Sequence, residues 1–314
     1  LTGNRTAALF AGCAYASSCA VLFHPVASGV HERLHLALPA LGLWLALRFR
    51  DEGRWRDLIL FTGALGVLAL ASPAYSVFLG LAMVLVAPVD VALAAGGEPA
   101  VGRPRAARRW LAAGLCALAA FAAVGWLTSR CVAEESHGGR GFGGDPDSLS
   151  AWPSVTAPVD VAGKMETLPL ECFLSPRALD ACASRDVDFL YRYPYPGYVL
   201  MVLAAAGVLL GKRRRSRALA ALGFVVLLIS LGPVLRWHAD DSAYWVAHPT
   251  LWLARLVPFV HRTHVWQLVP VAQLLLAVGA VELLASRVPT TWRHLAVAGA
   301  VILLLGETIL AGRS

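Results

Sequence analysis

The chain has 314 residues, of which 58% are hydrophobic and 15% are charged. A soluble globular domain has roughly 45–50% apolar and about 25% charged residues, so this composition excludes an ordinary soluble enzyme. The formal net charge is +7, but the basic residues stand in short segments between long apolar runs. That arrangement is typical of membrane proteins and argues against nucleic-acid binding.

Apolar runs recur along the whole chain, and a membrane-spanning helix needs roughly 17–25 such residues. We expect spans at about 7–23, 34–48, 58–73, 75–95, 110–128, 196–211, 218–235, 265–285 and 295–311. The predicted fold is therefore an all-α polytopic transmembrane helix bundle with about nine spans and one long external loop. Residues 1–128 are predicted to form the N-terminal helices (about five spans), 129–195 the external polar loop, and 196–314 the C-terminal helices (about four spans).

The loops between these spans differ in basic charge. Sixteen of the 27 Lys and Arg fall in about 45 residues, in the N-terminus, 48–57, 96–109, 212–217 and 286–294. Because cytoplasmic loops carry the excess of Lys and Arg, the N-terminus is predicted to be cytoplasmic and the C-terminus external. Arg outnumbers Lys 25 to 2, which suggests a GC-rich bacterial genome. The predicted location is thus the bacterial inner membrane, as a multi-pass protein.

The predicted external loop contains Cys131, Cys172 and Cys182. In an oxidising compartment one disulfide is expected, and we choose Cys172–Cys182 because it closes the shortest loop. The Gly-rich stretch 136–145 lies in the same segment. It lacks the flanking strand, helix and Lys of a phosphate-binding loop, so we predict a flexible loop and no cofactor.

Residues His31, Glu32 and His35 form an HExxH pattern. On a helix its two His lie on one face and bind zinc in metalloproteases, with the Glu as general base. A third zinc ligand is not evident in the chain, and Arg33 would place a positive charge beside the metal. We therefore predict no metal site, and a membrane-embedded zinc metalloprotease stays as an alternative.

Ionisable residues within apolar segments are costly and suggest either function or a structural partner. Asp90 and Glu282 lie near predicted cytoplasmic helix ends, and Glu307 lies towards the outer end of the last span. We interpret all three as solvated at a helix end or held by a structural partner. No regular series of acids indicates a proton relay.

Arg262 lies between His261 and His264 at the end of the second predicted external loop. A guanidinium at the membrane surface can bind a phosphate or pyrophosphate through two parallel hydrogen bonds. It can equally be an interfacial cation that attracts lipid headgroups. Both interpretations stay open.

Several short motifs occur in a familiar order. They are His31 and His35 before a span with Trp44, Ser72-Pro73-Ala74-Tyr75, Tyr195-Pro196-Gly197, Lys212-Arg213-Arg214-Arg215, Ser230-Leu231-Gly232-Pro233, and Val257-Pro258-Phe259 with Arg262. This order resembles the middle and C-terminal part of bacterial polytopic glycosyltransferases of the GT-C-type superfamily. The resemblance implies transfer of a sugar from a polyprenyl-phosphate donor to an acceptor outside the cytoplasmic membrane.

Members of that superfamily use an acidic residue in the first external loop near the N-terminus. The first external stretch here, about 24–33, offers only Glu32, so the catalytic residue is left unassigned. We expect either that an N-terminal part carrying the acid is missing or that the chain is not catalytic. His31, His35 and Arg262, with Glu32 as a weaker candidate, are predicted to contact phosphate or substrate. The expected partners are membrane lipids and a lipid-linked sugar; a transporter or a non-catalytic membrane protein are further alternatives.

Overall fold

The computed structural model describes residues 5–16, 37–71, 73–94, 102–137, 196–231 and 268–311. This part of the chain is all-helical, which confirms the predicted all-α class. The helices are α1 (Arg5–Ala16), α3 (Ala37–Glu52), α4 (Trp55–Ala71), α5 (Pro73–Ala94), α6 (Arg103–His137), α11 (Tyr198–Leu210), α12 (Arg214–Ser230), α14 (Val269–Arg287) and α15 (Thr290–Ala311). Each of the predicted apolar segments overlaps one of them, with ends that differ by several residues in most cases.

Helix boundaries follow from local sequence signals. Pro73 opens α5 and Pro270 stands in the first turn of α14, where a missing N–H costs little. Gly53 ends α3 with φ at 72°, and its N–H donates to the carbonyl of Phe49 at 2.8 Å. α6 is much longer than predicted: it has 35 residues and includes the basic stretch that we expected as a loop. Ala and Arg are strong helix formers, so a charged, Ala-rich stretch continues the helix.

Two of the described helices are both long enough and apolar enough to cross a membrane. Arg103–Leu127 of α6 and Val269–Arg287 of α14 are long and apolar enough, and Leu79–Ala94 and Tyr198–Leu210 are shorter apolar helices. Two such helices are weak evidence alone, because a buried helix of a soluble protein has the same length and composition. The nine-span count therefore stays a prediction.

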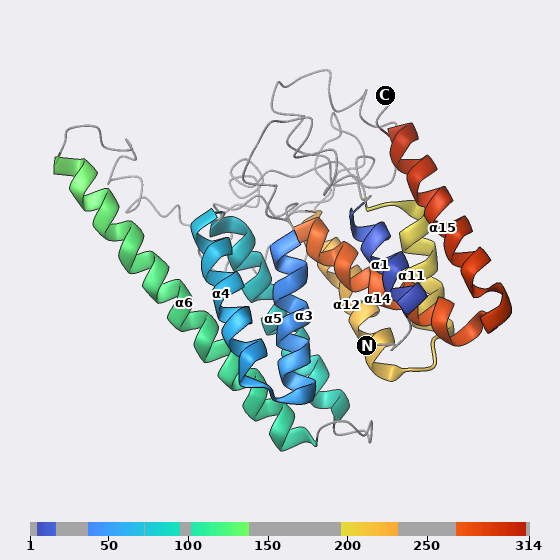
Figure 1. The fold of residues 1–314 in the computed structure, drawn as a ribbon, viewed down its shortest axis with the longest axis horizontal. Coiled ribbons are helices and arrows are strands. Elements are labelled where there is room, and N and C mark those ends of the chain that lie inside the picture. The colour runs from blue at the N-terminus through green and yellow to red at the C-terminus, as the bar shows by residue number, and fades with distance from the viewer. Residues whose placement is uncertain are drawn as a thin grey trace, which may run out of the picture.

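Successive helices alternate in direction (Figure 1). The ends of α3, α5, α11 and α14, and the starts of α1, α4, α6, α12 and α15, consequently lie together at the lower end of the molecule in that view. We call this the basic end, because it carries the Arg-rich segments at 48–56, 103–109, 212–217 and 287–293.

Two apolar cores hold the bundle together. The first lies among α3, α4, α5 and α6 and includes the fully buried Phe61 and Leu65, with residues of α12 and α14 at its border. The second joins α1, α11 and α15 to α14 and includes Phe10 and Leu200. α14 contributes to both cores, so it is the central helix that joins the two halves.

Small residues bring α11, α12 and α14 unusually close. A Cβ at Gly207 would overlap the backbone of Gly279, and a Cβ at Gly279 would meet the side chain of Ala220. Gly223 on α12 faces Leu275 and Ala272 of α14 in the same way. Glycine and alanine at helix crossings are typical of membrane bundles, because helices in lipid associate through close van der Waals packing and not through the hydrophobic effect.

The outer surface of the bundle is rich in large apolar side chains. α4, α6 and α15 expose them over several turns: Ile59, Leu60, Val67, Leu70, Leu111, Leu115, Leu118, Leu295, Ile302 and Leu303. Isolated apolar side chains are normal on a soluble surface, but contiguous patches are not.

Candidate functional site

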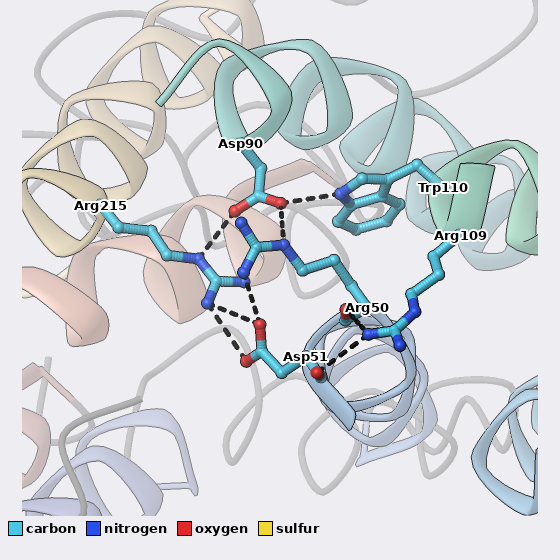
Figure 2. Close-up of polar contacts among 6 residues, drawn as sticks. All are labelled: Arg50, Asp51, Asp90, Arg109, Trp110 and Arg215. Atoms are coloured by element: carbon cyan, nitrogen blue, oxygen red, sulfur yellow. Dashed lines mark hydrogen bonds and ion pairs between the residues drawn. The ribbon is translucent and has the colours of Figure 1, made fainter. Parts of the chain in front are cut away.

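The most concentrated group of polar contacts lies at the basic end, inside the first half of the bundle. Four elements supply it: the end of α3, the end of α5, and the first turns of α6 and α12. We call it the charge cluster, and its members are Arg50, Asp51, Asp90, Arg109, Trp110 and Arg215 (Figure 2).

Asp90 is the centre of the charge cluster and is fully buried. Its Oδ2 lies 2.6 Å from Nε of Arg50 and accepts a hydrogen bond of 2.8 Å from the indole N–H of Trp110. Its Oδ1 lies 2.7 Å from Nε of Arg215. One carboxylate therefore connects α5 to α3, α6 and α12.

Asp51 is a second bridge between the same two guanidinium groups. Its Oδ1 accepts from Nη1 of Arg50 at 2.6 Å, and Nη1 of Arg215 lies 3.1 Å and 3.2 Å from its two oxygens. The Asp51 side chain is 33% exposed, so this pair lies at the rim of the charge cluster, with Asp90 behind it. Two Asp and two Arg thus form a closed arrangement with no net charge.

Arg109 acts on the backbone at the end of α3. Its Nη1 donates to the carbonyl oxygens of Arg50 and Asp51 at 2.7 Å and 2.9 Å. The last carbonyls of a helix have no partner within the helix and carry its partial negative charge, so a guanidinium there is stabilising. A Cβ on Gly53 would clash with the Arg109 guanidinium, which adds to the positive φ as a reason for glycine.

Arg48 forms a smaller contact on the neighbouring face of α3. Its Nε lies 3.3 Å from Glu52 and 3.4 Å from the buried carboxylate of Asp57 on α4, and its guanidinium stands over the Trp44 ring. Asp57 lies in the first turn of α4, where the helix dipole favours a negative charge. This contact ties the two helices together at the basic end.

The acids of the C-terminal half bind backbone N–H groups. Glu282 of α14 accepts from the N–H groups of Lys212 and Arg213 at 3.2 Å and 3.1 Å, immediately before α12. Glu307 of α15 accepts from Tyr198 and Val199 at 2.6 Å and 3.3 Å, in the first turn of α11. With Asp90, all three acids within apolar segments have structural partners, as one of the two interpretations of the sequence predicts.

Chemically, the charge cluster joins helices and does not resemble a catalytic centre. Removing charges from water is costly and is offset only by close, well-placed partners. Both oxygens of Asp90 contact a guanidinium or indole group. The described ranges also contain no group of three or more His, Cys, Asp or Glu that could hold a metal ion.

The predicted site residues lie elsewhere. His31, Glu32, His35, Arg262 and the pair Cys172 and Cys182 all fall outside the described residues. Their roles as substrate contacts and as a disulfide stay predictions. The sequence indicated Asp90 and the basic segments separately, but it did not indicate that Arg50 and Arg215 pair with Asp90, or that Trp110 bonds to it.

Known proteins give no direct guide to this chain. No protein-family model matches its sequence. No curated protein and no solved structure matches it either. The likeness to GT-C-type glycosyltransferases therefore rests on the order of its short motifs alone.

Proposed function

We propose that the chain is a multi-pass protein of the bacterial inner membrane, with about nine spans and its basic end in the cytoplasm. The observation that carries this is the alternation of helix direction, which brings Arg-rich segments distant in sequence to one end of the bundle (Figure 1). Loops on the cytoplasmic side of membrane proteins carry an excess of Lys and Arg, so the basic end is assigned to the cytoplasm.

Two further features support a bilayer as the surrounding medium. α4, α6 and α15 present large apolar side chains outwards over several turns, which in water would promote association. α11, α12 and α14 pack through Gly207, Gly223 and Gly279, as helices do where apolar burial gives no advantage.

The activity proposed at the opposite, external face is transfer of a sugar from a polyprenyl-phosphate donor. It is supported by the resemblance to GT-C-type glycosyltransferases and by the concentration of predicted polar residues on that side. His31, His35 and Arg262 would hold the lipid phosphate, since cations stabilise the charge that develops on a departing phosphate. Glu32 would lie beside them, and the catalytic acid stays unassigned. The charge cluster at the basic end would act as a structural anchor.

The topology is tested by fusing alkaline phosphatase or green fluorescent protein after residues 100, 150, 212 and 240. Green fluorescence is expected at 100 and 212 and phosphatase activity at 150 and 240, because each reporter matures on one side of the membrane. The reverse pattern, or the same reporter active at all four positions, would contradict the proposed orientation.

The transferase activity is tested by the envelope glycan profile of cells that lack the protein and are complemented with variants. Wild type and the control Arg105→Ala, an exposed residue at the basic end, should restore the profile. His35→Ala and Arg262→Ala should not. Full restoration by both variants would rule out the assigned roles, and stoichiometric zinc that is lost in His31→Ala would favour the metalloprotease.

A further inference from the structure

An apolar groove runs between α5 and α6, starting at the basic end. Its cavity has a volume of about 580 Å³. Ligand sites typically have volumes of roughly 300–1,000 Å³, so the groove is large enough for part of a ligand. It is lined by α5 from Gly80 to Val91 and by α6 from Ala107 to Phe121.

The groove is hollow because small residues line both helices. Gly80 and Ala87 lie on its α5 wall, and Ala107 and Gly114 lie on its α6 wall. A Cβ added at Gly114 would meet no atom within 4 Å, so open space begins at that backbone. The hollow therefore exists because glycine and alanine occupy these positions.

The rims of the groove are apolar and exposed. Val84 on α5 is 68% exposed, and Leu111, Leu115 and Leu118 on α6 are each more than half exposed. No charged side chain lines the cavity. An occupant that matches this surface must itself be an apolar chain.

A positive charge stands at the open end of the groove. Arg103 is exposed and lies four residues before Ala107, which places it on the same face of α6 one turn nearer the end. Side chains on a helix lean towards its N-terminus, so the guanidinium of Arg103 extends beyond the groove. The same end is the N-terminus of α6, whose partial positive charge adds to that of Arg103.

We propose that this groove binds an anionic glycerophospholipid of the cytoplasmic leaflet, with one acyl chain between α5 and α6 and the phosphate at Arg103. The inference rests on the membrane placement proposed above but not on sugar transfer. Charge complementarity selects the headgroup, and the apolar lining selects the chain.

A second copy of the protein fits this groove less well. A partner helix is a rigid rod of side chains, and packing it over a concave surface leaves gaps that forfeit van der Waals contact. A flexible acyl chain follows the hollow between Gly80 and Gly114. A neighbouring copy would also bring its own Arg-rich segment to the end where Arg103 stands.

The bound lipid would contact the charge cluster through one side chain. The Trp110 ring lines the groove while its N–H donates to Asp90. Occupancy of the groove would therefore restrain the same indole that holds the buried carboxylate.

The test uses the full chain, first shown to resist carbonate extraction from membranes, then purified in detergent and studied by native mass spectrometry. The probes are phosphatidylglycerol and phosphatidylcholine with identical acyl chains. Wild type should retain one phosphatidylglycerol, with phosphatidylcholine bound about tenfold more weakly, which corresponds to 1.4 kcal/mol. Release of the chain by carbonate would contradict the membrane placement itself, whereas a carbonate-resistant chain without retained lipid would contradict the groove alone.

Two variants with matched controls locate the lipid. Gly114→Phe should fill the groove and lower phosphatidylglycerol retention at least tenfold, whereas Gly63→Phe on α4, another glycine with no atom within 4 Å of an added Cβ, should not. Arg103→Gln should remove the preference for phosphatidylglycerol, whereas Arg105→Gln, on another face of α6, should keep it. Unchanged retention in Gly114→Phe, unchanged preference in Arg103→Gln, or displacement by polyprenyl phosphate at equal concentration would overturn the proposal.

Discussion

The two halves of the bundle hold their acids differently. In the first half, Asp90 and Asp51 pair with the guanidinium groups of Arg50 and Arg215. In the second half, Glu282 and Glu307 accept hydrogen bonds from backbone N–H groups at the starts of helices. The first arrangement joins side chains from separate helices, and the second completes the hydrogen bonding of a helix end.

The helices also approach one another differently. α11 and α14 meet at Gly207 and Gly279, where no side chain separates the backbones, and Glu282 of α14 reaches the N–H groups of Lys212 and Arg213 just after α11. α3, α5 and α12 are bridged at the basic end by long Arg side chains. Arg215 of α12 pairs with Asp51 of α3 and Asp90 of α5, so the charge cluster also fixes α12 against these two helices (Figure 2).

The largest expected effect comes from removing the buried charge in Asp90→Asn. The guanidinium groups of Arg50 and Arg215 would lose their central counter-ion, and breaking a buried ion pair costs about 3–5 kcal/mol. The measurement is thermal unfolding of the detergent-solubilised protein, followed by size-exclusion chromatography. Glu52→Gln, which affects a partly exposed carboxylate, is the control.

The double variant Asp90→Asn with Arg215→Gln sharpens that result. It removes one charge of each sign, so the double variant should lose less stability than the sum of the two single variants. If Asp90→Asn has no larger effect than Glu52→Gln, the charge cluster does not stabilise the bundle.

The second effect tests close approach in the other half. Gly207→Ala places a methyl group against the backbone of Gly279, and overpacking of this kind costs about 1–3 kcal/mol. The same unfolding measurement applies. Gly299→Ala on α15, where an added Cβ meets nothing, should be neutral or slightly stabilising because Ala favours helix. Equal behaviour of the two variants would show that α11 and α14 are not held at glycine contact.

The third effect is the loss of a carboxylate cap. Glu282→Gln keeps an oxygen near the N–H groups of Lys212 and Arg213 but removes its charge, and a lost cap costs about 1 kcal/mol. Hydrogen–deuterium exchange should rise at residues 212–216 and stay unchanged at the start of α11, which Glu307 caps. Exchange that rises equally at both helix starts would contradict a local role for Glu282.

The sequence predicted the helices well and their partners poorly. Apolar runs of the right length identify a helix locally, and each predicted run overlaps one. The predicted loop at 96–109 was partly wrong because we assigned Arg-rich residues to loops, whereas Arg103 to Arg109 begin α6. Asp51 and Arg215 are 164 positions apart, so no local pattern connects them.

The sequence did locate one necessary half of the charge cluster. A carboxylate in an apolar helix needs a partner, so the sequence indicated that Asp90 would have one. It did not indicate which of several Arg residues that partner would be. The choice of Arg50 and Arg215 depends on which helix ends meet at the basic end, which only the packed bundle determines. The Trp110 contact had no signal at all, since an indole near a helix start is equally typical of a membrane interface.

The smallest expected effect comes from Arg54→Gln, which removes the most exposed ion pair described at the basic end. Arg54 pairs with Glu52 at 2.8 Å, but its side chain is 60% exposed. Solvent-exposed ion pairs contribute about 0.2–1 kcal/mol, so Arg54→Gln should change the unfolding midpoint little, and the change should vanish in high salt. The loss in Asp90→Asn should persist in the same salt because buried charges are screened much less. An Arg54→Gln effect as large as that of Asp90→Asn would mean that charge at the basic end acts through its total amount and not through the buried arrangement around Asp90.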